Sequence, residues 1–272
     1  MLFKKQFEQY QVGDVHLGNG TIQFQSIKLN VFSFAVDGVL IDTGAQSLLQ
    51  HFKSYFESVD VEQVVITHYH EDHTGGAKYM QNTYGYPVYM NKTKIDYCNK
   101  RADYPLYRKL FWGNRAAFKA LPLGKTFKSR HALWDVINTP GHAIDHLAFL
   151  NRETGQLFTG DLYVTPKTKV ILREEDVPTI INSLQEVLQY DFNEVFCCHA
   201  GYIKNGRKAL MNKLEYLLAL EYKVQKLHKE GNSKTEIQAK LFKKKYPITR
   251  VSLGEWDSKH IISTILSNGK VI

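Results

Sequence analysis

The sequence is poor in cysteine and contains no long hydrophobic run. Its 3 cysteines, Cys98, Cys197 and Cys198, form neither a C-x-x-C pair nor a framework of pairs, which argues against a disulfide scaffold. No apolar run approaches the roughly 20 residues of a membrane span. The first residues, Met-Leu-Phe-Lys-Lys-Gln, lack the apolar stretch of a signal peptide. We therefore expect a cytoplasmic protein with reduced thiols and no membrane partner.

Positive charge is in excess, and it is unevenly distributed. The net charge is +8 over 272 residues, and residues 91–130 alone hold 11 Lys and Arg against 2 Asp and Glu. Residues 203–272 hold 15 against 6, so the remainder of the chain is acidic. Basic segments attract anions, which include an anionic substrate, nucleic acid and a membrane surface. A solvated Lys-rich helix face explains the same counts, so charge alone leaves these alternatives open.

One short stretch concentrates ionisable side chains. Three imidazoles and two carboxylates occupy the six positions His68-Tyr69-His70-Glu71-Asp72-His73, directly after the apolar run Val61 to Ile66. Groups at this density repel one another and resist burial unless a positive charge compensates them. A divalent metal provides that charge. A metal site on a turn after a buried strand is the favoured interpretation, and a His-rich surface turn is the alternative.

Later apolar segments end in the same kind of residue. The predicted strands 134–138, 156–159 and 194–198 are followed by His142, Asp161 and His199. Strand ends are where layered α/β folds place their chemistry. The candidate ligands are His68, His70, Asp72, His73, His142, Asp161 and His199. This set is large enough for two metal ions that share a bridge; imidazole and carboxylate are typical of zinc and also suit iron or manganese.

The pattern H-x-H-x-D-H, followed by separate His, Asp and His residues at strand ends, resembles the metallo-beta-lactamase superfamily. The resemblance covers Val12 to Gly201 and implies an α/β fold, the four-layered αββα sandwich. It also implies two Zn²⁺ ions. His68, His70 and His142 would hold the first, Asp72, His73 and His199 the second, with Asp161 bridging.

Two further residues would support the ligands from behind. Asp42-Thr43-Gly44 is similar to an early Asp-x-Gly element of the superfamily, which assigns Asp42 to this role. His146 follows His142 by four positions and is a second candidate. Lactonases of the superfamily carry a Tyr shortly after the bridging Asp. Tyr163 lies near that position, one residue out of register, and is a weaker candidate for donating to an oxyanion in the substrate.

The resemblance narrows the chemistry without fixing the substrate. One class of true beta-lactamases has Cys where Asp161 stands, so Asp161 favours the general hydrolase branch of thioesterases, lactonases, phosphodiesterases and nucleases. Flavodiiron oxidoreductases usually have Glu at the position of His70, which favours zinc here over di-iron. Persulfide dioxygenases, which use one iron, retain a similar motif.

The expected reaction is attack by a metal-bound hydroxide on an ester, thioester or lactone carbonyl of a small, anionic substrate. Asp72 or Asp161 would carry the proton to the leaving group. The alternative is a phosphodiesterase or ribonuclease that uses the same metal site. A purely structural metal in a nucleic-acid-binding protein fits less well, because structural zinc sites have closed shells of four ligands.

The chain divides into a catalytic domain, residues 1–206, and a helical, winged-helix-like C-terminal region, residues 207–272. A long amphipathic helix is predicted from Arg207 to Glu230, and Ser233 is predicted to cap the next. The region resembles the tails of lactamase-like hydrolases, some of which are ribonucleases, and its 14 basic residues suit phosphate contacts. Residues 91–127, which are aromatic and basic, are interpreted as a lid or wall of the site, or as an ordinary insertion at the sheet edge.

Overall fold

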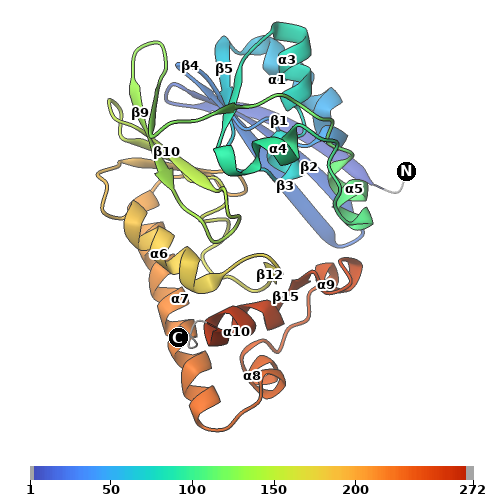
Figure 1. The fold of residues 1–272 in the computed structure, drawn as a ribbon, viewed down its shortest axis with the longest axis vertical. Coiled ribbons are helices and arrows are strands. Elements are labelled where there is room, and N and C mark those ends of the chain that lie inside the picture. Colours follow the sequence, from blue (N-terminus) through green and yellow to red (C-terminus); the bar gives the residue numbers. More distant parts are fainter. Residues whose placement is uncertain (1–2, 268–272) are drawn as a thin grey trace.

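Two β-sheets pack face to face, and helices cover both outer faces (Figure 1). The structure is a computed structural model that describes residues 3–267. The four layers confirm the αββα sandwich implied by the resemblance, and the helical C-terminal region follows it in the chain.

The first sheet has seven strands in the order β1-β2-β3-β4-β5-β6-β7. They are β1 (Lys4–Val12), β2 (Val15–Phe24), β3 (Ile27–Val36), β4 (Gly38–Ile41), β5 (Val61–Val65), β6 (Val88–Met90) and β7 (Leu121–Pro122). The first four form an antiparallel meander, and β4 to β7 run parallel. The predicted Asp-Gly hairpin is present between β3 and β4: Asp37 and Gly38 have φ of 48° and 79°, as a tight two-residue turn requires.

The second sheet has six strands in the order β14-β13-β11-β10-β9-β8. They are β8 (Thr126–Lys128), β9 (Leu133–Asn138), β10 (Leu147–Asn151), β11 (Gln156–Phe158), β13 (Glu194–Cys197) and β14 (Gly201–Ile203). Only the β11–β13 pair in this sheet is parallel. The parallel neighbours β11 and β13 therefore deliver the residues that follow them to the same edge of the sheet.

Apolar side chains hold the layers together in three clusters. Between the sheets lies an aromatic cluster in which the Phe158 and Phe196 rings stack with centroids 4.8 Å apart. β5 contributes Val64 to the outer cluster and Val65 to the inner one. This strand is therefore buried on both faces, as its continuous apolar run predicted.

Helices of the first half cover the outer face of the first sheet. They are α1 (Leu49–Ser58), α2 (Glu71–Thr74), α3 (Ala77–Tyr84), α4 (Ile95–Cys98) and α5 (Leu106–Trp112), with the short 3₁₀ turns η1 (Gln46–Leu48) and η2 (Lys92–Lys94). Phe52 of α1, Met80 of α3 and Phe111 of α5 pack into one core against that sheet. The aromatic, basic segment 91–127 thus supplies α4 and α5 on this side of the molecule.

The remaining helices cover the second sheet and continue beyond it. They are α6 (Val177–Val187), α7 (Gly206–Lys229), α8 (Lys234–Leu241), α9 (Pro247–Val251) and α10 (Ser258–Ser267). α7 approaches β13 closely at its first residue: a Cβ on Gly206 would lie 2.1 Å from a Val195 methyl carbon, so no larger residue fits. Within the described residues, no helix combines the length and the apolar character needed to cross a bilayer.

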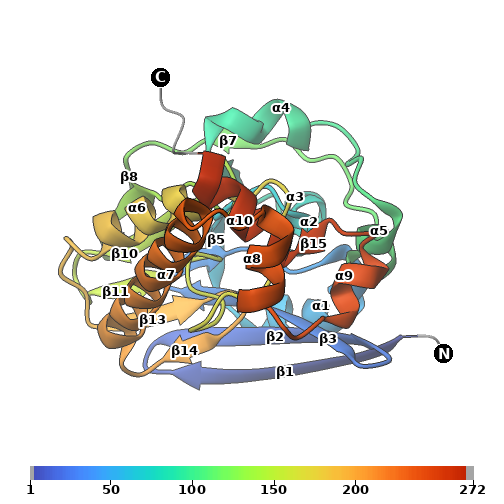
Figure 2. The same cartoon turned by 90° about the horizontal axis from the view of Figure 1, so that it is seen from below.

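The C-terminal region returns to the sandwich near the site. β15 (Trp256–Asp257) pairs with β12 (Ile171–Leu172), and α9 lies beside α5 (Figure 2). The predicted cap is confirmed, because Ser233 and Glu236 form a reciprocal capping box at the start of α8. The division of the chain into domains at residue 206 stays a prediction.

Candidate metal centre

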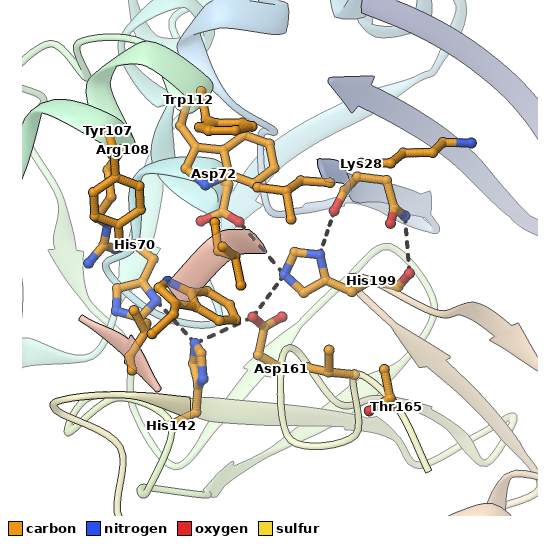
Figure 3. Close-up of a pocket in the computed structure, with 17 residues that line it drawn as sticks. Lys28, His70, Asp72, Tyr107, Arg108, Trp112, His142, Asp161, Thr165 and His199 are labelled. Atoms are coloured by element: carbon orange, nitrogen blue, oxygen red, sulfur yellow. Dashed lines mark hydrogen bonds and ion pairs between the residues drawn. The ribbon is translucent and has the colours of Figure 1, made fainter. Parts of the chain in front are cut away.

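Seven imidazole and carboxylate side chains meet at one edge of the sandwich, and Figure 3 shows His70, Asp72, His142, Asp161 and His199 among them. They come from the turn after β5 and the start of α2, and from the segments that follow β9, β11 and β13. They are the seven ligands predicted from the sequence: His68, His70, Asp72, His73, His142, Asp161 and His199. The fold therefore brings residues more than a hundred positions apart in the chain close enough to bind the same metal ion.

Three ring nitrogens form the first group. His70 Nδ1 lies 3.0 Å from His68 Nε2 and 3.1 Å from His142 Nε2. Two nitrogens bound to one tetrahedral zinc lie about 3.3 Å apart. Burial lowers the pKa of His68 well below its ordinary value and that of His70 to about 4, so both rings favour the neutral form that binds metal.

The second group contains Asp72, His73 and His199. Asp72 Oδ2 lies 3.8 Å from His73 Nε2 and 3.6 Å from His199 Nε2. Asp161 stands between the groups: its Oδ2 is 2.9 Å from His199 Nε2 and 3.3 Å from His142 Nε2, and its Oδ1 is 3.5 Å from His73 Nε2. A single carboxylate therefore reaches ligands of both groups.

Two buried atoms of this cluster have no hydrogen-bond partner among the described residues. They are His73 Nε2 and Asp161 Oδ1. A buried polar atom left unpaired costs about 1–3 kcal/mol. Although burial opposes it, Asp161 and Asp72 raise the pKa of His73 well above its ordinary value. The unpaired ligand atoms and the clustered carboxylates fit a site that binds divalent cations.

The outward ring nitrogens of three histidines are held by acidic side chains. His73 Nδ1 lies 2.8 Å from Asp42 Oδ2, and His70 Nε2 lies 2.9 Å from Glu174 Oε1. His142 Nδ1 lies 3.2 Å from Glu175 Oε2. Such contacts fix the tautomer and ring orientation of a ligating histidine and increase its basicity.

The other two ligand histidines use neutral partners. His68 Nδ1 lies 3.1 Å from Thr67 Oγ1, and His199 Nδ1 donates to the Asn30 carbonyl at 2.5 Å. All five candidate imidazoles are therefore oriented from behind, with their free nitrogens directed at the site.

Asp42 and His146 contact candidate ligands on the side away from the cluster centre. Asp42 accepts from the Thr67 backbone N–H at 2.8 Å and from the Thr67 hydroxyl at 2.7 Å, in addition to its contact with His73. His146 Nε2 accepts from the Asp161 N–H at 2.9 Å. Burial lowers the pKa of His146 to about 3, so the ring is neutral and able to accept.

Sequence reasoning missed the carboxylates of Glu174 and Glu175. Together they form an acidic turn before α6, and no spacing connects them to their partners His70 and His142, which lie more than 30 residues away in the chain. It also missed the role of Glu71, which is 3% exposed and binds Arg108 of α5 through two bonds of 2.6 and 2.7 Å. The position of Glu71 within the H-x-H-x-D-H motif was the sequence feature that could have pointed to this role.

Tyr163 does not lie where an oxyanion donor is needed. It is 7% exposed and belongs to the core cluster shared with α6 and α7. The next two residues, Val164 and Thr165, line the cavity above the metal cluster instead. The Tyr163 side chain therefore packs toward the helices, and this placement does not support its expected role as a donor to an oxyanion.

A cavity of about 270 Å³ opens onto the metal cluster. Its lining includes His70, Asp72, His142, Asp161 and His199 on one side. The opposite wall is apolar and aromatic and is made by Leu29, Tyr107, Phe111, Trp112, Ile248 and Trp256. The segment 91–127 thus forms a wall of the site, and the C-terminal region adds to that wall.

The αββα sandwich with a cluster of candidate metal ligands at the edge of its sheets defines a class of metal-binding folds. The comparison with known families is more specific. The family model described as "Metallo-beta-lactamase superfamily" matches residues 29–199, and the chain belongs to that superfamily.

Several relatives share this region at low identity. "Thioesterase pkgB" of Emericella nidulans is 27% identical over 75% of this chain and 55% of that protein. "Atrochrysone carboxyl ACP thioesterase" of Passalora fulva is 24% identical over 75% of this chain and 57% of that protein. The chain thus spans little more than half the length of these relatives. Among solved structures, a beta-lactamase domain protein from Burkholderia ambifaria superposes with a TM-score of 0.68 at 14% identity, over 96% of this chain and 88% of that one.

Proposed function

We propose that this protein is a dinuclear zinc hydrolase that cleaves an ester, thioester or lactone of a small molecule, with a thioester favoured. The observation that carries the proposal is Asp161, whose two oxygens face histidines of both ligand groups. One of those oxygens is buried without a hydrogen-bond partner among residues 3–267. Two groups joined by one carboxylate suit two ions about 3.5–4 Å apart.

The ligand groups assign a place to each ion. His68, His70 and His142 would hold the first, and Asp72, His73 and His199 the second. When bound, divalent cations lower the pKa of a coordinated water and polarise a carbonyl oxygen. Iron or manganese would suit the same donors.

The protein's own side chains have three further tasks. Asp72 and Asp161 line the cavity and can accept a proton and pass it to a leaving group. Phe111, Trp112 and Trp256 provide an apolar surface for an acyl chain and exclude water from it. Arg108, bound to Glu71, holds α5 against the ligand turn and so fixes this wall.

The preference for thioesters is supported by two kinds of observation. Both curated relatives described above bear the name thioesterase. The cavity, at about 270 Å³ with an aromatic wall, has the character of a small-molecule site. A cytoplasmic location stays a prediction.

Phosphodiester cleavage is the second candidate. A cleft of about 490 Å³ lies between α8, α9 and α10 and is lined by Lys244, Lys245 and Arg250. Such side chains suit phosphate contacts. The cleft shares no residue with the cavity of about 270 Å³, and it shares only Val170 and Tyr246 with a smaller cavity at the metal cluster, so we rank this candidate lower.

One screen tests the proposal. The purified protein is assayed for metal content and against matched esters, thioesters, lactones, phosphodiesters and RNA at low and high salt. We expect about two zinc ions per chain and thioester turnover that is indifferent to salt. RNA cleavage that falls steeply with salt would favour the second candidate. Full activity in metal-free protein would reject both.

A further inference from the structure

Lys213 is a buried cation in the C-terminal half of the molecule. It lies on α7 and is 5% exposed. Its ammonium donates to the Tyr163 carbonyl and, at 3.4 Å, to the Thr165 carbonyl. Within residues 3–267, no carboxylate lies within ion-pair distance of it. A buried charge without a counter-ion is costly, and an ammonium has three donors, of which two carbonyls use two.

Lys213 lines a second cavity that opens onto the same metal cluster. This cavity, of about 200 Å³, shares His142, Asp161 and His199 with the larger one. Lys167 and Lys169 also line it, and both are exposed. Since a water molecule occupies about 30 Å³ in the liquid, the space holds roughly six or seven waters. It suits a small charged group and is too small for a nucleic-acid strand.

We propose that Lys213 recognises a small anionic group of the substrate, a carboxylate or a phosphate, that lies within a few bonds of the scissile carbonyl. The acyl chain lies against the aromatic wall, and the anionic group enters the smaller cavity. This inference rests on the proposed hydrolase function and adds the substrate's charge to it. The anion would form the ion pair with Lys213 that no carboxylate of residues 3–267 is close enough to form.

A structural role for Lys213 is the alternative that the test must separate. The turn it holds is strained: Val164 has φ of 51°, which is unusual for a β-branched residue, and the Thr165 N–H bonds the Tyr163 carbonyl at 2.6 Å. Holding this turn requires hydrogen-bond donors but no positive charge. The amide of a glutamine also donates, so Lys213→Gln retains donors for the turn and removes the charge, whereas Lys213→Met removes both.

The test uses thioesters with one acyl chain and thiols that differ only in charge. The anionic thiol is 3-mercaptopropionate and the neutral one its methyl ester. A second pair places the carboxylate on the acyl side, as a succinyl thioester and its methyl ester. We expect Lys213→Gln and Lys213→Met to raise KM about 10-fold or more for at least one anionic member, with its neutral partner changed less than twofold. Lys208→Met, an exposed lysine on the same helix, is the matched control and should change neither.

Two results would overturn the inference. In the first, Lys213→Met loses activity equally on charged and neutral substrates, and Lys213→Gln has the activity of wild type. That result would indicate a structural role. In the second, the wild-type protein has the same KM for each anionic thioester as for its neutral methyl ester.

A binding measurement separates this inference from the proposed function. The melting temperature of the metal-loaded protein is followed with added propionate and, separately, inorganic phosphate. We expect at least one anion to stabilise wild type and Lys208→Met and to leave Lys213→Gln unaffected, even if no thioester is cleaved. Equal stabilisation of all three proteins, or of none, would contradict the role of Lys213.

Discussion

The edge of the sheets and the C-terminal helices contribute different things to one site. The edge supplies the seven candidate ligands and the carboxylates that orient them. The helices supply no candidate ligand; α9 and β15 add apolar wall through Ile248 and Trp256, and α7 adds Lys213. We therefore expect the sandwich to set the metal chemistry and the segments packed over it to set the choice of substrate.

Removal of a candidate ligand at the edge of the sheets should have the largest effect on activity. We expect His68→Ala to lose zinc and to lower kcat/KM at least about 100-fold, because one ion loses a ligand whose contribution is several kcal/mol. Metal analysis and steady-state kinetics on the favoured thioester check this. His51→Ala, an exposed histidine on α1, is the control. Wild-type metal content in His68→Ala would contradict the ligand assignment.

The carboxylates behind the ligands should have the next largest effect. Glu174→Gln and Glu175→Gln should each weaken zinc binding about 10- to 100-fold, because His70 and His142 lose the negative partner that fixes their tautomer. Competition with a chelator measures the affinity. Glu186→Gln, an exposed glutamate on α6, should behave as wild type. Unchanged affinity in both site variants would show that these contacts do not tune the metal.

The contribution of Lys213 to stability should depend on pH. Burial lowers its pKa from 10.5 to about 8, and the nearby Cys197, Glu175 and Asp161 oppose that shift. Between pH 8 and 10.5 the unfolded chain retains this proton and the folded protein does not, so the free energy of unfolding rises with pH.

We expect the stability of wild type relative to Lys213→Met to rise by about 2 kcal/mol between pH 8 and pH 10. Urea unfolding at several pH values measures it. Cys197 titrates in both proteins, so its contribution largely cancels. Parallel pH profiles for the two proteins would show that Lys213 keeps its ordinary pKa.

The smallest expected effect concerns the turn after Asp161. Val164→Gly relieves a backbone conformation that costs about 1–3 kcal/mol for a residue of this type. Part of this gain in stability is lost because glycine gives the unfolded chain more conformational freedom. We expect a net gain in stability of about 1 kcal/mol, measured at the midpoint of thermal unfolding. Val36→Gly, in β3, should be destabilising and serves as the contrast. A loss of stability in Val164→Gly would show that the turn is not strained.

The same division explains what could be predicted from the sequence. His68 to His73 lie on one turn, and the later candidate ligands each follow an apolar strand, so short-range pattern and family resemblance together predicted which side chains the structure brings together. Glu174, Glu175 and Lys213 act through contacts between segments far apart in the chain, and nothing in their local sequence marks them. Tyr163 shows that a local match can also mislead, because its side chain lies one position out of register and packs in the core.

The most direct test of the account is the zinc stoichiometry of wild type and of Asp161→Ala after metal removal and reconstitution. Asp161 is a carboxylate whose oxygens lie near histidines of both ligand groups. The account predicts about two zinc ions per wild-type chain and weakened binding of both in the variant. Wild type that takes up no zinc, or Asp161→Ala that binds two ions as tightly as wild type, would contradict it.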